Sequence, residues 1–241
     1  MAKVKKLFTI LILLITLSFS TSCITLAPNE EKQIINDFTS NAIISATFSI
    51  NVYKQIGLKE ERVAQGSGVI FSKEEYYGSV NTFYLLTNNH VISNGASYTV
   101  SDCYGKEISA TLVKNDSNYD LAILKFNSSE DYKILNFVKS DVQNGDKVIA
   151  VGTPNGQLNA VTFGKVQKYS FVTVEDGELD SNVNFKVIEH NAPIYSGSSG
   201  GVLLNYSFEI CGINYATYIE NEKFVLGYAI SASKVLEFIN G

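Results

Sequence analysis

Short apolar or alternating runs, separated by polar residues and glycines, fill most of the chain. They are rich in Val, Ile, Tyr and Phe, and this pattern is typical of many short β-strands. Helical periodicity is scarce within this part of the chain. The first six runs cover residues 42–52, 68–71, 83–86, 97–101, 108–113 and 120–126, and the second six cover residues 147–152, 160–165, 184–189, 201–204, 209–215 and 224–230.

Two sets of about six strands predict two antiparallel β-barrels, because closure removes the exposed edges of a chain made almost entirely of strands. The predicted fold class is all-β, with the first six-stranded barrel in residues 42–137 and the second in residues 138–241. Residues 231–240 predict a short C-terminal helix, with Ser231 or Ser233 as its N-cap.

The first 22 residues predict an export signal. Three lysines precede an apolar run, residues 7–19, that is shorter than the ~20 residues needed to span a bilayer. An uncleaved membrane anchor is the alternative. Small residues then lead to Cys23, as in a bacterial lipoprotein cleavage site, although Ser20 stands where such sites usually carry leucine. We therefore expect export from a bacterial cell, either as a cell-envelope lipoprotein with Cys23 lipidated or as a secreted protein.

Residues 23–41 are mostly polar and predict a spacer with one amphipathic turn or short helix. The net charge of −5 gives no basic footprint, which argues against a nucleic-acid partner. Membrane contact is expected only through the N-terminal anchor. Cys103 and Cys211 fall in different predicted barrels and are expected to be unpaired thiols. With two histidines and no paired cysteines, we expect neither a metal site nor a cofactor.

Two serines stand between glycines in Gly197-Ser198-Ser199-Gly200-Gly201, and the second of them, Ser199, is directly followed by the glycine pair. Glycines let the backbone fold tightly and bring its amides close to a bound carbonyl. We expect Ser199 to be a nucleophile and the amides of Gly197 and Ser199 to form an oxyanion hole. A simple Gly/Ser turn is the alternative interpretation.

A histidine and a carboxylate complete a candidate triad. His90 follows an apolar strand that would carry it to a barrel rim, where a neutral imidazole can accept the serine proton. Asp120 begins an apolar run that draws it inward, and a buried carboxylate needs a partner such as an imidazole N–H. Asp116 is a local competitor for this role. His190 is predicted to be structural or to line a pocket.

The chain order of these residues excludes two other hydrolase classes. Residues 197–201 also fit G-x-S-x-G, but α/β-hydrolases carry their histidine after the serine, and both histidines here precede it. Subtilisins place an aspartate before the histidine and need parallel strands with crossover helices. The order His, Asp, Ser is that of the two-barrel serine proteases.

Taken together, six motifs resemble those of the HtrA/Deg-type trypsin-like serine proteases, over about residues 42–240. They are Gly66-Ser67-Gly68-Val69-Ile70, Thr87-Asn88-Asn89-His90-Val91, Asp120-Leu121-Ala122-Ile123-Leu124, Val151-Gly152-Thr153-Pro154, Ser198-Ser199-Gly200-Gly201 and Gly212-Ile213-Asn214. The resemblance implies an active site between the barrels, with His90 and Asp120 from the first and Ser199 from the second.

The chain departs from the family pattern at Ser198, usually Asn, and at Val202, usually Pro. Neither side chain performs the chemistry, so activity is expected to survive. Many members carry a C-terminal peptide-binding PDZ domain, whereas this chain runs only one helix past its second barrel. We therefore expect no such domain.

The resemblance also implies an apolar primary pocket without an acidic residue. Its lining would include Ala192, Ile194, Ile213, Asn214, Tyr215, Gly227 and Ala229. The expected activity is a serine endopeptidase acting on unfolded or surface polypeptides, with cleavage after small or medium apolar residues and not after Lys or Arg. A catalytically weak peptide-binding scaffold of the same fold is one alternative, and a narrow-specificity secreted toxin or maturation protease is another.

Overall fold

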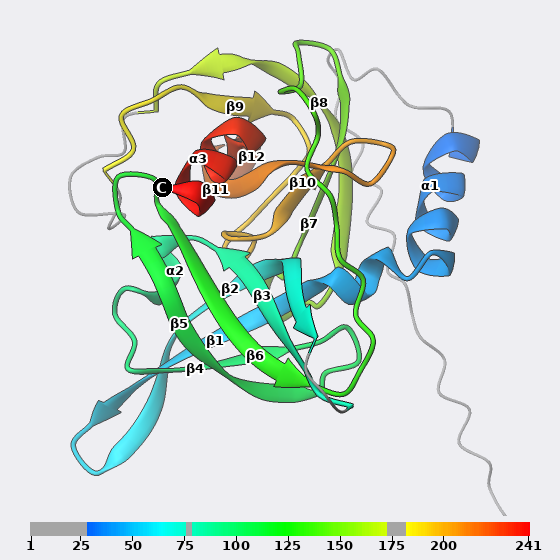
Figure 1. The fold of residues 1–241 in the computed structure, drawn as a ribbon. Helices are drawn as coiled ribbons and strands as arrows, with labels where there is room; N and C mark the ends of the chain where they lie inside the picture. Colours follow the sequence, from blue (N-terminus) through cyan, green and yellow to red (C-terminus); the bar gives the residue numbers. More distant parts are fainter. Residues whose placement is uncertain (1–27, 76–78, 173–181) are drawn as a thin grey trace, which may run out of the picture.

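The computed structural model describes residues 28–75, 79–172 and 182–241, which form two closed six-stranded antiparallel barrels with short helices around them (Figure 1). The predicted all-β fold is confirmed. The predicted export signal, Cys23 and the first residues of the spacer lie outside the described residues.

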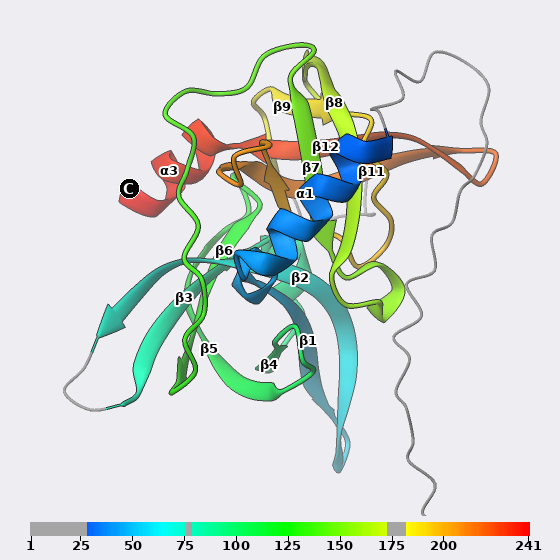
Figure 2. The same ribbon diagram turned by 90° about the vertical axis from the view of Figure 1, so that its right-hand side faces the viewer.

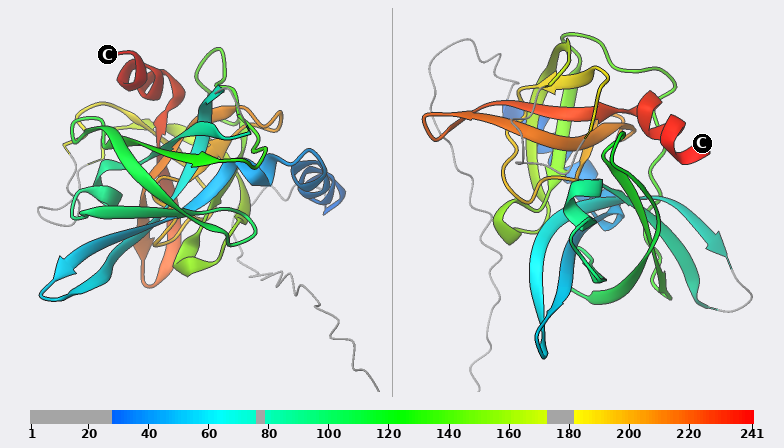
Figure 3. Two further views of the ribbon diagram at one scale, coloured as in Figure 1. Left: turned by 60° about the horizontal axis from the view of Figure 1, so that its bottom comes forward. Right: turned by 90° about the vertical axis from the view of Figure 1, so that its left-hand side faces the viewer.

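The first barrel closes in the order β1-β2-β3-β6-β5-β4. Its strands are β1 (Thr47–Ile56), β2 (Lys59–Glu75), β3 (Asn81–Thr87), β4 (Ser97–Ser101), β5 (Glu107–Asp116) and β6 (Leu121–Ser128). Phe48, Phe83 and Phe126 pack around Tyr132 in its interior, with ring centroids between 5.1 and 5.9 Å apart. The β1–β2 hairpin extends beyond this barrel, with exposed Leu58 in its turn (Figure 3).

The second barrel closes in the order β10-β11-β12-β9-β8-β7. Its strands are β7 (Lys147–Gly152), β8 (Ala160–Ser170), β9 (Val187–His190), β10 (Val202–Leu204), β11 (Ile210–Glu220) and β12 (Lys223–Ser231). Buried aliphatic residues such as Val148, Val166 and Leu203 fill its interior together with Cys211. A 3-10 turn, η2 (Pro154–Gly156), follows β7.

The spacer forms helix α1 (Pro28–Ser40), which packs against the second barrel and leads through the 3-10 turn η1 (Ile43–Ala46) into β1 (Figure 2). Phe38 is buried, with its ring centroid 5.9 Å from that of Phe208. Glu30 forms an ion pair with Lys147 at 2.6 Å. Of the two expected forms, one amphipathic turn or a short helix, the spacer therefore adopts the helix, which docks through Phe38.

Helix α3 (Ala232–Asn240) ends the chain, as predicted. Its N-cap residue is Ser231, one of the two expected, but the Ser231 side chain makes no cap hydrogen bond. Asp141, in the connection between the barrels, caps the helix instead. Its carboxylate accepts from the Ser233 amide at 3.0 Å and from the Ser233 hydroxyl at 2.6 Å.

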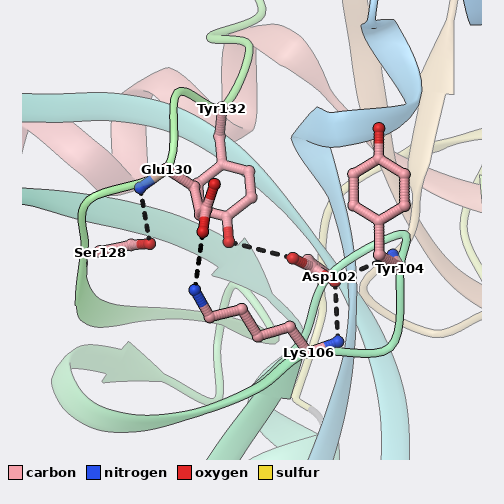
Figure 4. Close-up of polar contacts among 6 residues, drawn as sticks. All are labelled: Asp102, Tyr104, Lys106, Ser128, Glu130 and Tyr132. Carbon is pink, nitrogen blue, oxygen red and sulfur yellow. Dashed lines mark hydrogen bonds and ion pairs between the residues drawn. The ribbon is translucent and has the colours of Figure 1, made fainter.

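A buried carboxylate holds the β4–β5 turn (Figure 4). Asp102, 2 % exposed, accepts hydrogen bonds from the amides of Tyr104 and Lys106, both at 2.9 Å, and from the Tyr132 hydroxyl at 3.1 Å. Burial, with the nearby Asp102 charge, raises the pKa of Tyr132 to about 12. The phenol therefore stays protonated and donates to the carboxylate. Cys103 and Cys211 are both free thiols, one in each barrel region, as predicted.

Candidate active site

His90 and Asp120 lie in two connecting segments of the first barrel, and their side chains are in contact. His90 lies in a single helical turn, α2 (Asn89–Ile92), that follows β3, and Asp120 lies in the turn between β5 and β6. His90 Nδ1 lies 2.7 Å from Asp120 Oδ2, and the His90 amide donates to Asp120 Oδ1 at 2.8 Å. The aspartate side chain is fully buried, whereas 12 % of the histidine side chain is exposed. This two-point contact fixes the orientation of the ring and leaves Nε2 as its outer nitrogen.

The backbone at Asp120 is in the left-handed region, with φ of 49°. Aspartate tolerates this conformation better than most residues other than glycine. The Asn88 side-chain amide donates to the Asp120 carbonyl at 2.9 Å, and the Asp120 amide donates to Ser117 O at 3.3 Å. These contacts stabilise the unfavourable backbone conformation in which the Asp120 carboxylate contacts His90. The competing carboxylate, Asp116, instead accepts from the Asn118 amide at 2.7 Å within the turn.

Ser199 lies in the loop between β9 and β10, and its backbone contacts the first barrel. The Ser67 amide on β2 donates to Ser199 O at 2.8 Å. A Cβ on Gly66 would lie 2.7 Å from a Val91 methyl group and 3.0 Å from Ser199 O. Since Val91 follows His90 directly, the close approach at Gly66 brings the histidine turn and the serine backbone to the same point.

Two amides of this loop are available to bind an oxyanion. Among the described residues, neither the Gly197 nor the Ser199 amide donates a backbone hydrogen bond. Ser196 O accepts from the Asn155 amide at 2.9 Å, and Ser198 O accepts from the Gly201 amide at 2.9 Å. The C=O and N–H of a trans peptide point in opposite directions. These bonds therefore turn the following amides, of Gly197 and Ser199, away from Asn155 and Gly201.

Gly197 needs to be glycine at this position. Its φ is +93°, and a Cβ there would lie 2.6 Å from Thr153 O. The loop consequently packs backbone to backbone against the segment that follows β7.

The residues expected to line the primary pocket lie on β11, β12 and the loop after β9, but they pack in two different clusters. Ala192, Ile194 and Ala229 belong to the interior of the second barrel, and Ile213 and Tyr215 belong to the core that the two barrels share. In the strand register, Asn214 pairs with Ala229 and His190 pairs with Gly227. A Cβ at Gly227 would meet His190 Cε1 at 2.4 Å and Ile194 Cγ1 at 3.0 Å. These two side chains occupy the space over Gly227. The remaining expected lining residues, Ala192, Ile213 and Tyr215, are buried.

His190 is fully buried, and neither ring nitrogen has a hydrogen bond of good geometry among the described residues. Desolvation lowers the pKa of His190 to about 4, and the nearby Asn214 side chain and Ala192 backbone offset only part of this effect. The ring is therefore neutral, and it is His90 that contacts the Asp120 carboxylate.

Sequence reasoning gave no role to the residues that hold the serine loop in place, Ser67, Thr153 and Asn155. The only signal was that Ser67 and Thr153 fell inside motifs carrying the family resemblance. Their contacts are to backbone groups, which no side-chain pattern reveals. Among the described residues, no group of three or more His, Cys, Asp or Glu side chains could hold a metal ion.

Two antiparallel barrels with a His–Asp pair on one and a glycine-flanked serine on the other define the trypsin-like class of fold. Residues 66–213 match the family described as trypsin-like peptidase domain, and the chain belongs to this family.

The sequence is 38 % identical over 173 residues to the "Serine protease Do-like HtrA" of Bacillus subtilis (strain 168), covering 70 % of this chain and 37 % of the relative. It is 33 % identical over 179 residues to a "Probable periplasmic serine endoprotease DegP-like" of Rhizobium meliloti (strain 1021), covering 73 % of this chain and 33 % of the relative. The chain thus spans about a third of the length of these curated relatives. The fold is similar to the crystal structure of the Rv3671c protease in an inactive form, with a TM-score of 0.67 and 21 % identity, covering 86 % of this chain and 93 % of that one.

Proposed function

We propose that the chain is a serine endopeptidase that cleaves polypeptides through an acyl-enzyme. Ser199 attacks the peptide carbonyl, His90 accepts its proton and returns it to the leaving amine, and Asp120 holds the ring in the required tautomer. The amides of Gly197 and Ser199 stabilise the oxyanion. The observation that carries this proposal is the two-point contact between His90 and a fully buried Asp120.

The proposed preference at the cleavage site is for small or medium apolar residues. His190 and Ile194 occupy the space over Gly227, and no acidic side chain is among the expected lining residues. A long basic side chain would therefore find no counter-charge. Cleavage profiling on a peptide library should show Ala, Val or similar residues before the cut, and strong cleavage after Arg would contradict this specificity.

Export to the bacterial envelope is proposed from the leader sequence and from relatives whose names call them periplasmic. Lipidation at Cys23 would tether the enzyme to a membrane surface. No helix in the described part of the chain is long and apolar enough to cross a membrane. We expect the wild-type chain in the membrane fraction and a Cys23→Ser variant in the soluble fraction, measured by fractionating the producing cells. Equal distributions would contradict the anchor.

The nucleophile is tested with the full-length chain purified in a mild detergent. Wild type should digest unfolded casein and take up a fluorophosphonate label on Ser199, located by mass spectrometry. Ser199→Ala should lose about 10⁶ in kcat and all labelling. The matched variant Ser198→Ala, which removes the adjacent hydroxyl, should keep the label on Ser199. Equal digestion by wild type and Ser199→Ala would contradict the mechanism and favour a peptide-binding scaffold.

A further inference from the structure

Ser67, in the middle of β2 of the first barrel, makes four polar contacts with the segments around the candidate site. Its side chain is buried, with 1 % of the residue exposed. The Ser67 hydroxyl donates to Gly197 O at 2.7 Å and accepts from the Thr153 amide at 2.8 Å. The Ser67 amide donates to Ser199 O at 2.8 Å, and its carbonyl accepts from the Thr87 hydroxyl at 2.8 Å.

The first hydroxyl contact acts directly on the serine loop. Gly197 O belongs to the peptide between Gly197 and Ser198, which lies between the two peptides that carry the proposed oxyanion donors, the N–H groups of Gly197 and Ser199. That peptide is held at its other end by the Ser198 amide, which donates to Tyr195 O at 2.8 Å. The Ser67 hydroxyl therefore fixes the rotation of the peptide between the two oxyanion donors.

The second hydroxyl contact acts through the segment after β7. Thr153, whose amide donates to Ser67 Oγ, lies two residues before Asn155, and the Asn155 amide holds Ser196 O. Ser196 O and the Gly197 amide share one peptide, so their orientations are linked. A single hydroxyl thus supports the peptides on both sides of Gly197, one directly and one through Thr153–Asn155.

We propose that Ser67 is a positioning residue that sets the oxyanion hole of the second barrel from a strand of the first barrel. The inference rests on the proposed function. Ser67 lies on the barrel that supplies His90 and Asp120, and its hydroxyl contacts the loop that carries Ser199. It therefore fixes the position of the oxyanion donors, the Gly197 and Ser199 amides, relative to the His90 imidazole. It acts through Gly197 and Thr153 and contacts no reacting atom.

Ser45 offers a matched control for a hydroxyl that merely satisfies backbone groups. It is also buried, at 7 % exposed, and its hydroxyl donates to Ala42 O at 2.8 Å and accepts from the Lys133 amide at 3.0 Å. Ser45→Ala removes the same two kinds of hydrogen bond as Ser67→Ala, but far along the chain from the serine loop.

The experiment measures kcat, KM and the affinity for a peptide boronate, which mimics the tetrahedral intermediate, in the full-length chain. Ser67→Ala should lower kcat about 10- to 100-fold, less than the ~10²–10³ lost with an oxyanion donor itself. KM should change less than threefold, and boronate affinity should fall by the same factor as kcat/KM. Ser45→Ala should keep kcat within about twofold. If Ser67→Ala does not fold, Ser67→Cys retains the volume with a weaker donor and should show a smaller loss in the same direction.

Hydrogen exchange separates this inference from the proposed function. In Ser67→Ala, and not in Ser45→Ala, exchange should rise in peptides covering residues 149–157 and 194–201. If wild type neither hydrolyses casein nor takes up the label, the proposed function fails while exchange still decides the role of Ser67. The positioning role is overturned if Ser67→Ala keeps wild-type kcat, or if its boronate affinity and exchange match those of Ser45→Ala.

Discussion

Both the side chain and the backbone of Asp120 are constrained. Its side chain is fully buried against His90, and its backbone lies in the left-handed region at φ of 49°. Strained backbone of this kind persists only where the surroundings fix it, as Asn88 and Ser117 do here. Asp120→Asn changes only the side-chain constraint, because asparagine tolerates the same backbone conformation and has no charge.

Asp120→Asn is expected to fold normally and to lose about 10⁴ in kcat, because an amide next to His90 Nδ1 favours the wrong tautomer. The measurement is kcat on a chromogenic peptide together with the free energy of unfolding. Asp116→Asn is the control, since that carboxylate contacts the Asn118 amide instead, and its kcat should stay within about twofold. A comparable loss in both variants would contradict the assignment of the orienting carboxylate.

The buried His190 is expected to make the stability of the chain depend on pH. Burial lowers its pKa from 6.5 to about 4 in the folded chain. Between these values the unfolded chain binds a proton that the folded chain excludes. Stability is therefore complete above pH 6.5 and falls as the pH drops toward 4.

The expected loss in the free energy of unfolding from this residue is up to about 3 kcal/mol over that interval. His190→Leu, which is apolar and does not titrate, should reduce the slope of stability against pH between pH 6.5 and 4. Urea unfolding of both proteins across this range measures the difference. Parallel curves for wild type and variant would show that His190 is not the group responsible.

At the scale of the element, α3 links the chain end to the turn that carries Asp120. The Tyr119 hydroxyl donates to Glu237 Oε1 at 2.5 Å, and Lys114 Nζ donates to Phe238 O at 2.6 Å. Phe238 is buried. The final helix therefore supports the residue that precedes the orienting aspartate.

The cap on α3 yields a prediction at this scale. Asp141→Ala removes the acceptor for both the Ser233 amide and the Ser233 hydroxyl and should lower the free energy of unfolding by about 1–2 kcal/mol. Ser231→Ala should cost less than about 0.5 kcal/mol, because the Ser231 hydroxyl makes no cap bond. Chemical denaturation measures both. An equal or larger loss in Ser231→Ala would show that the helix is capped by its own serine.

The strands and their division into two sets could be predicted, because buried strands are short apolar or alternating runs rich in Val, Ile, Tyr and Phe that polar residues and glycines separate. Every predicted run overlaps a strand, and errors lie at the ends, as where Asp120 precedes β6 and η1 precedes β1. Contacts between distant backbone groups leave no such pattern. The Asp141 cap, the docking of Phe38 and the Ser67 hydroxyl all depend on which segments meet, so the sequence alone could not assign them.

At the scale of the whole molecule, one hydrophobic core joins the barrels. Leu86 and Leu121 of the first barrel pack in the same buried cluster as Val151 and Val202 of the second, and Phe38 of α1 joins them. Neither barrel therefore covers its apolar surface without the other.

This shared core predicts a single unfolding transition. Calorimetry of the full-length chain should give one peak with equal calorimetric and van't Hoff enthalpies. Leu86→Ala should shift that peak down as a whole, at a cost of about 2–5 kcal/mol. Two separate peaks, with only one moved by the substitution, would show that the barrels unfold independently.

The division of the candidate site between barrels also affects when the enzyme can first act. A ribosome completes the His–Asp half long before it reaches residue 199, and helix α3, which supports Tyr119, is made later still. A growing chain consequently lacks an assembled site until both barrels have been made.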